Sequence, residues 1–274
     1  MHLVRLWLLA LAACAGTAGG ASGAELARRT WTIDGTVREA LVHVPAASGT
    51  PAPVLFFFHG RSGKVAEVAA RHPFHTYWPE AIVVFPQGLP VAALRGDGGN
   101  LQPGWQVAPG QHDDRDLRFF DTLLASLRRE LRVDDRRVYV SGTSNGGGMT
   151  YLLWSQRASV FAAIAPTCTA ARALTATASA DAIRRLAPLP SLHVAGEKDA
   201  TIPFADQLQT IDLVREGRAC GPGVPWGSPP QRYATLHPSS SGAPLVTYVY
   251  PGGHGLPSDV TPVIVKFFRE HRRP

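Results

Sequence analysis

A serine set between glycines is the strongest chemical signal in this sequence. Residues 142–146 are Gly-Thr-Ser-Asn-Gly, directly after the apolar run 138–140 and directly before a segment with helical spacing. A sharp turn from a strand into a helix holds such a serine with its hydroxyl exposed, and small residues two positions away on either side let the turn pack closely. An ordinary glycine turn is the alternative. The placement between strand and helix favours Ser144 as a nucleophile.

A serine hydroxyl is a poor nucleophile at neutral pH, so it needs a nearby base and a carboxylate that fixes the tautomer of that base. Of the ten histidines, His254 has the best context, because it follows the apolar run 245–250 within Gly-Gly-His-Gly. The flanking glycines permit a tight loop that projects the ring; the alternative is a loop histidine that is simply exposed. His193 lies inside an apolar run and is predicted to be a packed core residue.

The acid must lie between nucleophile and base, because the chain order on such a scaffold is serine, acid, histidine. Asp199 meets this requirement, since it follows the apolar run 192–195 in the loop Gly-Glu-Lys-Asp. Glu197, Asp206 and Asp212 are rivals, although a carboxylate near a helix start can serve only as a cap. We predict Asp199 as the orienting acid.

An oxyanion formed during attack needs two backbone N–H donors aimed at it. Asn145, next after the serine, is expected to supply one, because a helix that begins there points its N–H groups at the site. The second is expected from Arg61, with Gly60 as the alternative, in the loop after the apolar run 54–58. His59 is predicted to order this loop on the substrate side; the alternative is a plain strand-end residue.

Strand-like and helix-like segments alternate along the chain. Strands are expected at 30–33, 40–44, 54–58, 81–85, 138–140, 161–165, 192–195 and 245–250, and helices at 116–131, 145–156 and 261–271. Such alternation implies the α/β class, with a mostly parallel sheet covered by helices on both faces. A long functional loop is expected up to about residue 112, and an irregular excursion over 220–244.

Composition is consistent with one globular domain over residues 24–274. The chain has 274 residues, of which 45% are hydrophobic and 18% charged, and a formal net charge of +6. The positive charge is carried by scattered arginines without a nucleic-acid motif, so solvated helix faces are favoured over a nucleic-acid partner. An acidic polymer or a membrane surface stays open as a partner.

Residues 1–23 have the pattern of an export signal. A basic start at Arg5 precedes an apolar run over 6–13 that is too short to span a bilayer, and small residues follow. Two ends are open: ordinary cleavage near residues 21–23, or a lipobox at Leu-Ala-Ala-Cys, in which Cys14 would carry a lipid. We therefore expect secretion or a cell-envelope location, with membrane contact only through such an anchor.

The remaining cysteines, Cys168 and Cys220, would form a disulfide in an oxidising compartment. Two buried free thiols are the alternative. Neither cysteine has metal-ligand spacing, so no metal site is predicted.

Several motifs together resemble the polyhydroxybutyrate depolymerase and feruloyl esterase branch of the α/β-hydrolases. They are His59-Gly60, Phe85-Pro86-Gln87-Gly88, Gly104-Trp105-Gln106, residues 136–140, Ser144-Asn145-Gly146-Gly147 with Met149, residues 161–165 and Gly252-Gly253-His254. The resemblance covers most of residues 52–258. It implies the α/β-hydrolase fold, ester hydrolysis through an acyl-enzyme without a cofactor, and the same three catalytic residues.

Trp105 resembles the substrate-side tryptophan of that branch, and the alternative is a packed anchor for its loop. Trp226 is a weaker candidate for the cleft. One departure concerns Asp116, since the branch usually has two aspartates just before the phenylalanine that aligns with Phe119, and this chain has Arg115 and Asp116. This puts the local order of the loop in doubt.

The sequence thus predicts an exported serine esterase acting on hydroxyalkanoate oligomers, feruloyl esters or other short or aromatic acyl esters. Its partner would be the ester substrate, as a small molecule, an oligomer or a polymer end. An acyltransferase of the same fold, a serine peptidase and a non-catalytic exported binding protein are the alternatives.

Overall fold

The structure is a computed structural model that describes residues 25–46, 49–92, 99–171, 180–228 and 231–274. The expected export signal, including Cys14, lies outside the described residues. None of the helices within these ranges is both long and apolar enough to cross a membrane.

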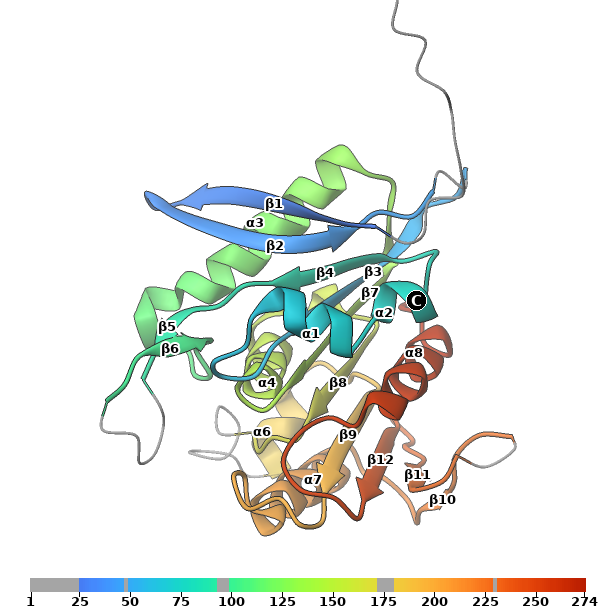
Figure 1. Ribbon diagram of the computed structural model, residues 1–274. Helices are drawn as coiled ribbons and strands as arrows, with labels where there is room; N and C mark the ends of the chain where they lie inside the picture. Colours follow the sequence, from blue (N-terminus) through green and yellow to red (C-terminus); the bar gives the residue numbers. More distant parts are fainter. Residues whose placement is uncertain (1–24, 47–48, 93–98, 172–179, 229–230) are drawn as a thin grey trace, which may run out of the picture.

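Ten strands form one sheet within the described residues (Figure 1). Six neighbours, β4-β3-β7-β8-β9-β12, run parallel, and antiparallel strands extend both edges. In sheet order the strands are β1 (Leu26–Ile33), β2 (Thr36–His43), β4 (Ile82–Pro86), β3 (Ala52–Phe58), β7 (Val133–Thr143), β8 (Ala163–Thr167), β9 (Ser191–Gly196), β12 (Leu245–Tyr250), β11 (Ala234–His237) and β10 (Val224–Pro225).

Central strands of this sheet are the continuous apolar runs of the sequence. Strands β3, β4, β8 and β9 are buried at every position, as expected for parallel strands covered on both faces. The expected long loop contains a small hairpin of β5 (Leu89–Val91) and β6 (Gln102–Gly104), and the expected irregular excursion contains β10 and β11. These strands have two to four residues, too few for an alternating pattern to be recognised.

Helices cover both faces of the sheet (Figure 1). One face carries α3 (Arg115–Glu130), α4 (Asn145–Arg157), α6 (Ala180–Arg185) and α7 (Phe204–Gly217); the other carries α1 (Val65–Arg71), α2 (Phe74–Tyr77) and α8 (Thr261–Arg269). Each set buries its own apolar cluster against the sheet. The predicted α/β class with a mostly parallel sheet is confirmed, although α1, α2, α6 and α7 were not anticipated.

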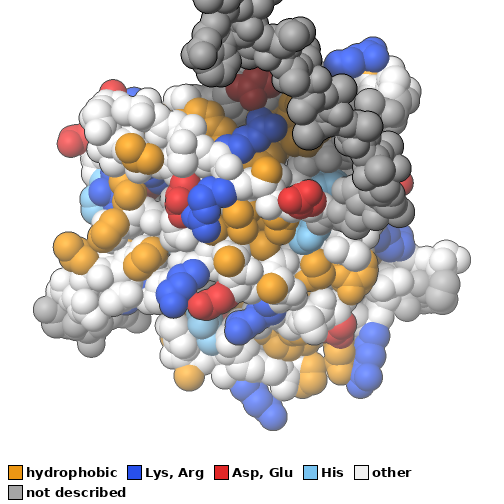
Figure 2. All heavy atoms as spheres, turned by 45° about the horizontal axis from the view of Figure 1, so that its top comes forward, with side chains coloured by type: hydrophobic (Ala, Val, Ile, Leu, Met, Phe, Trp, Pro, Cys, Tyr) orange, Lys and Arg blue, Asp and Glu red, His pale blue; other side chains and the backbone are white. Residues whose placement is uncertain are grey.

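Arginine side chains on the surface are largely matched by acids. On the face in Figure 2, basic side chains lie among acidic and hydrophobic ones rather than in one block. Arg157 pairs with Asp121, and Arg269 pairs with Glu80, at 2.8 and 3.0 Å. Exposed pairs of this kind contribute about 0–1 kcal/mol each, so they disperse charge more than they stabilise the fold.

The predicted disulfide is wrong, because Cys168 and Cys220 are both free thiols. Cys168 follows β8, and its sulfur lies 3.6 Å from the hydroxyl of Tyr250, the last residue of β12. The Cys220 thiol interacts instead with the backbone of Leu245, the first residue of β12. Six residues of strand separate these two places by roughly 16 Å, whereas a disulfide needs Cα atoms within about 7 Å.

Candidate active site

Ser144 occupies a strained turn between β7 and α4. Its φ is 56° and its ψ is −118°, in the left-handed half of conformational space that side chains disfavour. A Cβ at Gly142 would lie 2.4 Å from the Gly146 carbonyl oxygen, and one at Gly146 would lie 2.1 Å from the carbonyl oxygen of Phe58. Both positions therefore exclude a side chain, which is the physical reason for the two glycines around the serine.

The three residues predicted as a triad lie in one hydrogen-bonded chain. Ser144 Oγ is 2.9 Å from His254 Nε2, and His254 Nδ1 is 2.8 Å from Asp199 Oδ2. They follow β7, β12 and β9, whose carboxyl ends meet at one edge of the sheet. The His254 side chain is 25% exposed and the Asp199 side chain is fully buried, so the chain leads from solvent into the protein.

Asp199 is held as an acceptor by four donors. Its Oδ1 accepts from the N–H groups of Thr201 and Ile202, both at 2.9 Å, and its Oδ2 accepts from Gln207 Nε2 at 2.9 Å in addition to His254. These donors fix the position of the carboxylate. The rival Asp212 pairs instead with Arg215 on the exposed side of α7. Gln207 was not anticipated, because nothing in its spacing marks it.

Backbone bonds join the loop of the acid to the loop of His254. The Lys198 N–H donates to the Gly252 carbonyl at 2.8 Å. The Tyr250 hydroxyl lies 2.7 Å from the Gly253 carbonyl and 2.6 Å from that of Gly255, the residues on either side of the histidine. Tyr250 thus clamps the tight glycine loop that presents the ring, a role that the sequence did not reveal.

The loop after β3 approaches the serine. A Cβ on Gly60 would lie 3.4 Å from the Ser144 Cβ, an ordinary contact distance. The loop closes as a turn, since the Gly63 N–H donates to the Gly60 carbonyl at 3.0 Å. Arg61, the predicted oxyanion donor, lies within this turn, and its guanidinium donates to the Asn100 carbonyl. Asn145, the other predicted donor, is the first residue of α4, where N–H groups have no partner within the helix.

His59 holds the loop after β3 in place through hydrogen bonds of its ring. Its Nε2 accepts from the Gly88 N–H at 2.9 Å, so the ring proton must sit on Nδ1, which donates to the Gly60 carbonyl at 2.6 Å. Burial lowers the pKa of His59 to about 4, so the ring stays neutral near pH 7. The predicted ordering of the loop agrees with these bonds; the substrate-side position does not, because only 1% of His59 is exposed.

Trp105 is also a packed anchor and not a surface for stacking substrate. The residue is 2% exposed, its indole Nε1 donates to the His59 carbonyl at 2.9 Å, and its ring packs edge-on against Phe58. Its backbone N–H and carbonyl both bond the Asn145 side chain, at 2.7 and 3.0 Å. The predicted substrate contact is corrected because Trp105 is buried, and its bonds to Asn145 and His59 tie the serine turn to the loop after β3.

Trp226 lies away from the site altogether. It packs against Phe267 of α8, and its Nε1 donates to Glu270 at 3.2 Å.

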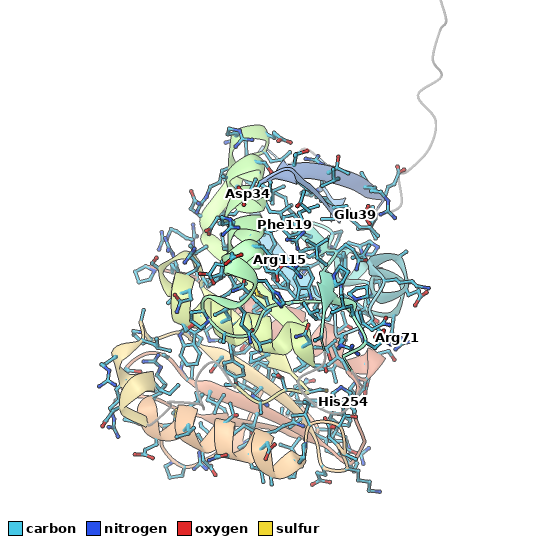
Figure 3. All side chains as sticks on the ribbon, turned by 90° about the vertical axis from the view of Figure 1, so that its left-hand side faces the viewer. Asp34, Glu39, Arg71, Arg115, Phe119 and His254 are labelled. Atoms are coloured by element: carbon cyan, nitrogen blue, oxygen red, sulfur yellow. The ribbon has the colours of Figure 1, made fainter. Side chains whose placement is uncertain are left out.

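Figure 3 shows His254 apart from Asp34, Arg115 and Phe119, which lie near the start of α3. Within the described ranges, no three His, Cys, Asp or Glu side chains gather as a metal site.

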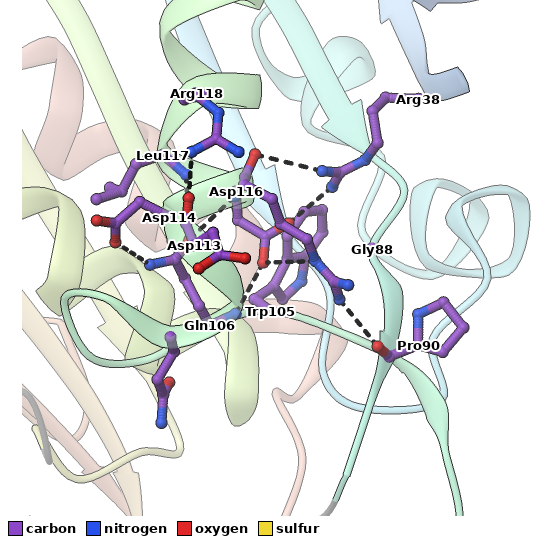
Figure 4. Close-up of polar contacts among 12 residues, drawn as sticks. Arg38, Gly88, Pro90, Trp105, Gln106, Asp113, Asp114, Asp116, Leu117 and Arg118 are labelled. Atoms are coloured by element: carbon purple, nitrogen blue, oxygen red, sulfur yellow. Dashed lines mark hydrogen bonds and ion pairs between the residues drawn. The ribbon is translucent and has the colours of Figure 1, made fainter. Parts of the chain in front are cut away.

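The loop that carries Trp105 is anchored by a buried ion pair (Figure 4). Asp116 accepts from Arg38 at 2.8 Å and from the Gln106 N–H at 2.9 Å, and Gln106 Nε2 donates to Asp114 at 2.8 Å. The Arg38 guanidinium also lies 4.1 Å from the centre of the Phe119 ring. The departure from the paired aspartates therefore leaves the loop ordered, because Asp114 and Asp116 both bond Gln106.

Asp116→Ala is expected to lower the free energy of unfolding by about 3–5 kcal/mol, because it leaves the buried Arg38 charge without its partner. Burial already lowers the pKa of Arg38, and Asp116 opposes that effect. Urea unfolding measures the change. Asp121→Ala on the same helix removes an exposed partner of Arg157 and should cost below about 1 kcal/mol. Equal losses in the two variants would contradict the buried-pair account.

Comparison with solved structures places this arrangement of strands and helices among known folds. The chain covers 99% of an acetyl xylan esterase from Aspergillus awamori with a TM-score of 0.68 at 14% identity, over 89% of its own length. It covers 94% of an S-formylglutathione hydrolase from Agrobacterium tumefaciens with a TM-score of 0.64, also at 14% identity and over 89% of its own length. The chain has the α/β-hydrolase fold. At these identities the likeness concerns the fold alone.

Sequence comparison finds relatives of this chain. The chain is 25% identical to a bifunctional acetylxylan esterase/xylanase of Neocallimastix patriciarum over 62% of its length, and 25% identical to feruloyl esterase B of Piromyces equi over 64%. It spans only 22% and 31% of those two proteins. A probable feruloyl esterase C of Aspergillus niger is 24% identical, over 78% of this chain and 76% of that protein. No family model matches.

These relatives confirm the resemblance to the feruloyl esterase-like branch that the motifs indicated. All three relatives are named as esterases.

Proposed function

We propose that this α/β-hydrolase is an exported serine esterase with Ser144 as nucleophile, His254 as general base and Asp199 as orienting acid, in one catalytic domain over residues 24–274. The supporting observation is the continuous chain from Ser144 Oγ to His254 Nε2, at 2.9 Å, and from His254 Nδ1 to Asp199 Oδ2, at 2.8 Å. A hydroxyl, a base and an acid in hydrogen-bond contact satisfy the geometry that nucleophilic catalysis by serine needs.

In the first stage, Ser144 Oγ attacks the ester carbonyl carbon while His254 Nε2 takes the hydroxyl proton. The N–H groups of Asn145 and Arg61 donate to the oxyanion, the C–O bond to the alcohol breaks, and His254 gives the proton to the leaving oxygen. In the second stage, His254 removes a proton from water, the resulting hydroxide attacks the acyl-enzyme, and the acid departs as Ser144 regains its proton. Ping-pong kinetics follow from these two stages.

Asp199 acts through His254 and not on the substrate. Its bond to Nδ1 leaves the neutral ring with a bare Nε2 facing the serine, and its negative charge stabilises the imidazolium that forms after proton transfer. The N–H groups of Thr201 and Ile202 keep the carboxylate in place from the other side.

For substrate we propose short or aromatic acyl esters, including acetyl and feruloyl esters of carbohydrate alcohols. The names of the relatives support this class. The exposure of the His254 side chain, at 25%, is consistent with an alcohol portion that extends into solvent, as an oligomer or polymer end would. The buried Trp105 and His59 are not proposed to contact the substrate.

A panel of esters tests this proposal. We expect turnover of p-nitrophenyl acetate, methyl ferulate and acetylated xylo-oligosaccharides, ranked by kcat/KM, with amide analogues of the same acyl groups much slower. Assays with added glycerol separate hydrolysis from acyl transfer, and free acid should remain the main product. Absence of turnover on every ester, or faster cleavage of the matched amides, would overturn the proposal.

A further inference from the structure

A buried polar chain continues from Asp199 into the core, on the side away from the serine. It consists of Gln207 on α7, His193 on β9 and Tyr151 on α4, which are 0%, 0% and 2% exposed. Helices α4 and α7 cover the same face of the sheet, to which β9 belongs. Burying a polar group costs free energy unless it is hydrogen-bonded. Each of these three side chains is therefore expected to have a hydrogen-bond partner.

The amide of Gln207 has one orientation. Its Nε2 lies 2.9 Å from Asp199 Oδ2 and 2.8 Å from the Ile202 carbonyl oxygen, and both of those atoms are acceptors. The nitrogen must therefore point at them, which turns the amide oxygen Oε1 away from the acid. The Gln207 side chain interacts with His193 and raises the pKa of the ring, against the larger lowering by burial.

The tautomer of His193 follows from its two neighbours. Its Nδ1 lies 2.7 Å from the Tyr151 hydroxyl. Burial raises the pKa of Tyr151, so the hydroxyl keeps its proton and donates. The proton of the neutral ring then sits on Nε2. His193 Nε2 and Gln207 Oε1 have no partner at ordinary hydrogen-bond geometry among the described residues, so each is the available complement of the other. Burial holds the pKa of His193 at about 4, which keeps the ring neutral at pH 7.

We propose that Tyr151, His193 and Gln207 are positioning residues that orient the Asp199 carboxylate toward His254 through one directed chain of donors. Tyr151 donates to His193, His193 interacts with the Gln207 side chain, and Gln207 donates to the same Asp199 oxygen that accepts from His254. None of the three touches the serine or the substrate. This inference depends on the proposed function only for its kinetic test.

Gln207 and His254 share one carboxylate oxygen, which gives the chain an electrostatic consequence. Removing the Gln207 donor leaves more of the negative charge directed at His254, which stabilises the protonated ring and withholds the base at low pH. The other titratable groups that face Asp199 are Cys168 and Tyr250, while Glu197 and Lys198 beside it are exposed. Cys168 and Tyr250 are unchanged in the variants below.

Gln207→Leu is expected to lower kcat by about 10–100-fold, on the scale of a slightly misplaced catalytic group, with KM unchanged. The acidic limb of the kcat/KM profile should move to higher pH. A merely structural role would lower the amount of active protein without moving that limb. Gln156→Leu, on the exposed side of α4, is the matched control and should leave both quantities unchanged. A Gln207→Leu profile that matches wild type in kcat and pH dependence would overturn the inference.

Tyr151→Phe removes a single oxygen atom, so it tests the same chain with a smaller change if the Gln207→Leu variant is unstable. We expect the acidic limb of the kcat/KM profile to move in the same direction as in Gln207→Leu, but by less. The double variant should lose no more activity than Gln207→Leu, because the effects of substitutions within one network are not additive. Tyr77→Phe, at an exposed position, is the control. Full additivity of the two substitutions would contradict a shared chain.

Nitrogen-15 NMR of the wild-type imidazoles gives a readout that needs no substrate. His193 should show a protonated Nε2 and a bare Nδ1, with no titration between about pH 5 and 8. A protonated Nδ1 would overturn the proposed direction of the chain. Fluorophosphonate labelling of Ser144 separates the two proposals. Failure to label wild type counts against the serine esterase, whereas equal labelling rates in wild type and Gln207→Leu count against the positioning role.

Discussion

Ser144→Ala is expected to lower kcat on p-nitrophenyl acetate by about 10⁶-fold, the scale seen when the nucleophile of a serine hydrolase is removed. The substitution removes the atom that would bond the acyl group, so hydrolysis falls back on direct attack by water. The N–H donors of Asn145 and Arg61 remain, and they should leave a residual acceleration of about 10³–10⁴ over water. Initial-rate assays at a saturating ester concentration measure the change in kcat.

Ser155→Ala is the control for that experiment. Ser155 lies on the same helix, and its hydroxyl bonds the Leu152 carbonyl at 2.8 Å, away from the site. The control should keep wild-type kcat. The Ser144 variant should remain folded, because its strained φ of 56° is unfavourable for serine as well as for alanine. Retention of most of the activity in Ser144→Ala would exclude this residue as the nucleophile.

His254→Ala is expected to cost as much as Ser144→Ala, about 10⁶-fold in kcat. Without the ring, no base lies 2.9 Å from the serine hydroxyl to take its proton, and the buried Asp199 cannot reach it in place of the ring. The double variant should be no worse than either single one, because nucleophile and base act as a unit. The same ester assay measures all three proteins.

His112→Ala, which changes an exposed histidine in the short helical turn directly before α3, is the control for the base. A small effect of His254→Ala, or a double variant that loses the product of the two single losses, would show that serine and histidine act independently.

Local patterns in the sequence carried the prediction of the three candidate residues. The serine turn is defined within five residues, and the glycines at 142 and 146 are required by contacts closer than 3 Å to backbone atoms. Asp199 and His254 follow apolar strands that are recognisable without any tertiary information. Because the carboxyl ends of parallel strands meet at one edge, the parallel direction of the strands was enough to predict that these residues lie at the same edge.

What the sequence could not reveal depends on side chains from elements that meet only in the fold. Gln207, His193 and Tyr151 come from a helix, a strand and another helix, with no shared spacing to mark them. Trp105 shows the same limit, because its residue type suits a substrate platform and a buried anchor equally. Only the bonds to His59 and Asn145 decide for the anchor.

The disulfide failed for a related reason. Counting cysteines gives an even pair after export, but says nothing about where Cys168 and Cys220 lie relative to β12. Their positions at opposite ends of that strand follow from the sheet order, in which β12 lies next to β9 and β11. Sheet order in turn rests on long-range pairing that no local pattern encodes.

Mapping the residue labelled by a fluorophosphonate is the most direct test of the central claim that His254 activates Ser144. Mass spectrometry of the digested wild-type protein should find one adduct, on the peptide that carries Ser144, and His254→Ala should label far more slowly. An adduct on a different residue, or ester turnover that persists with residue 144 unlabelled, would contradict the account.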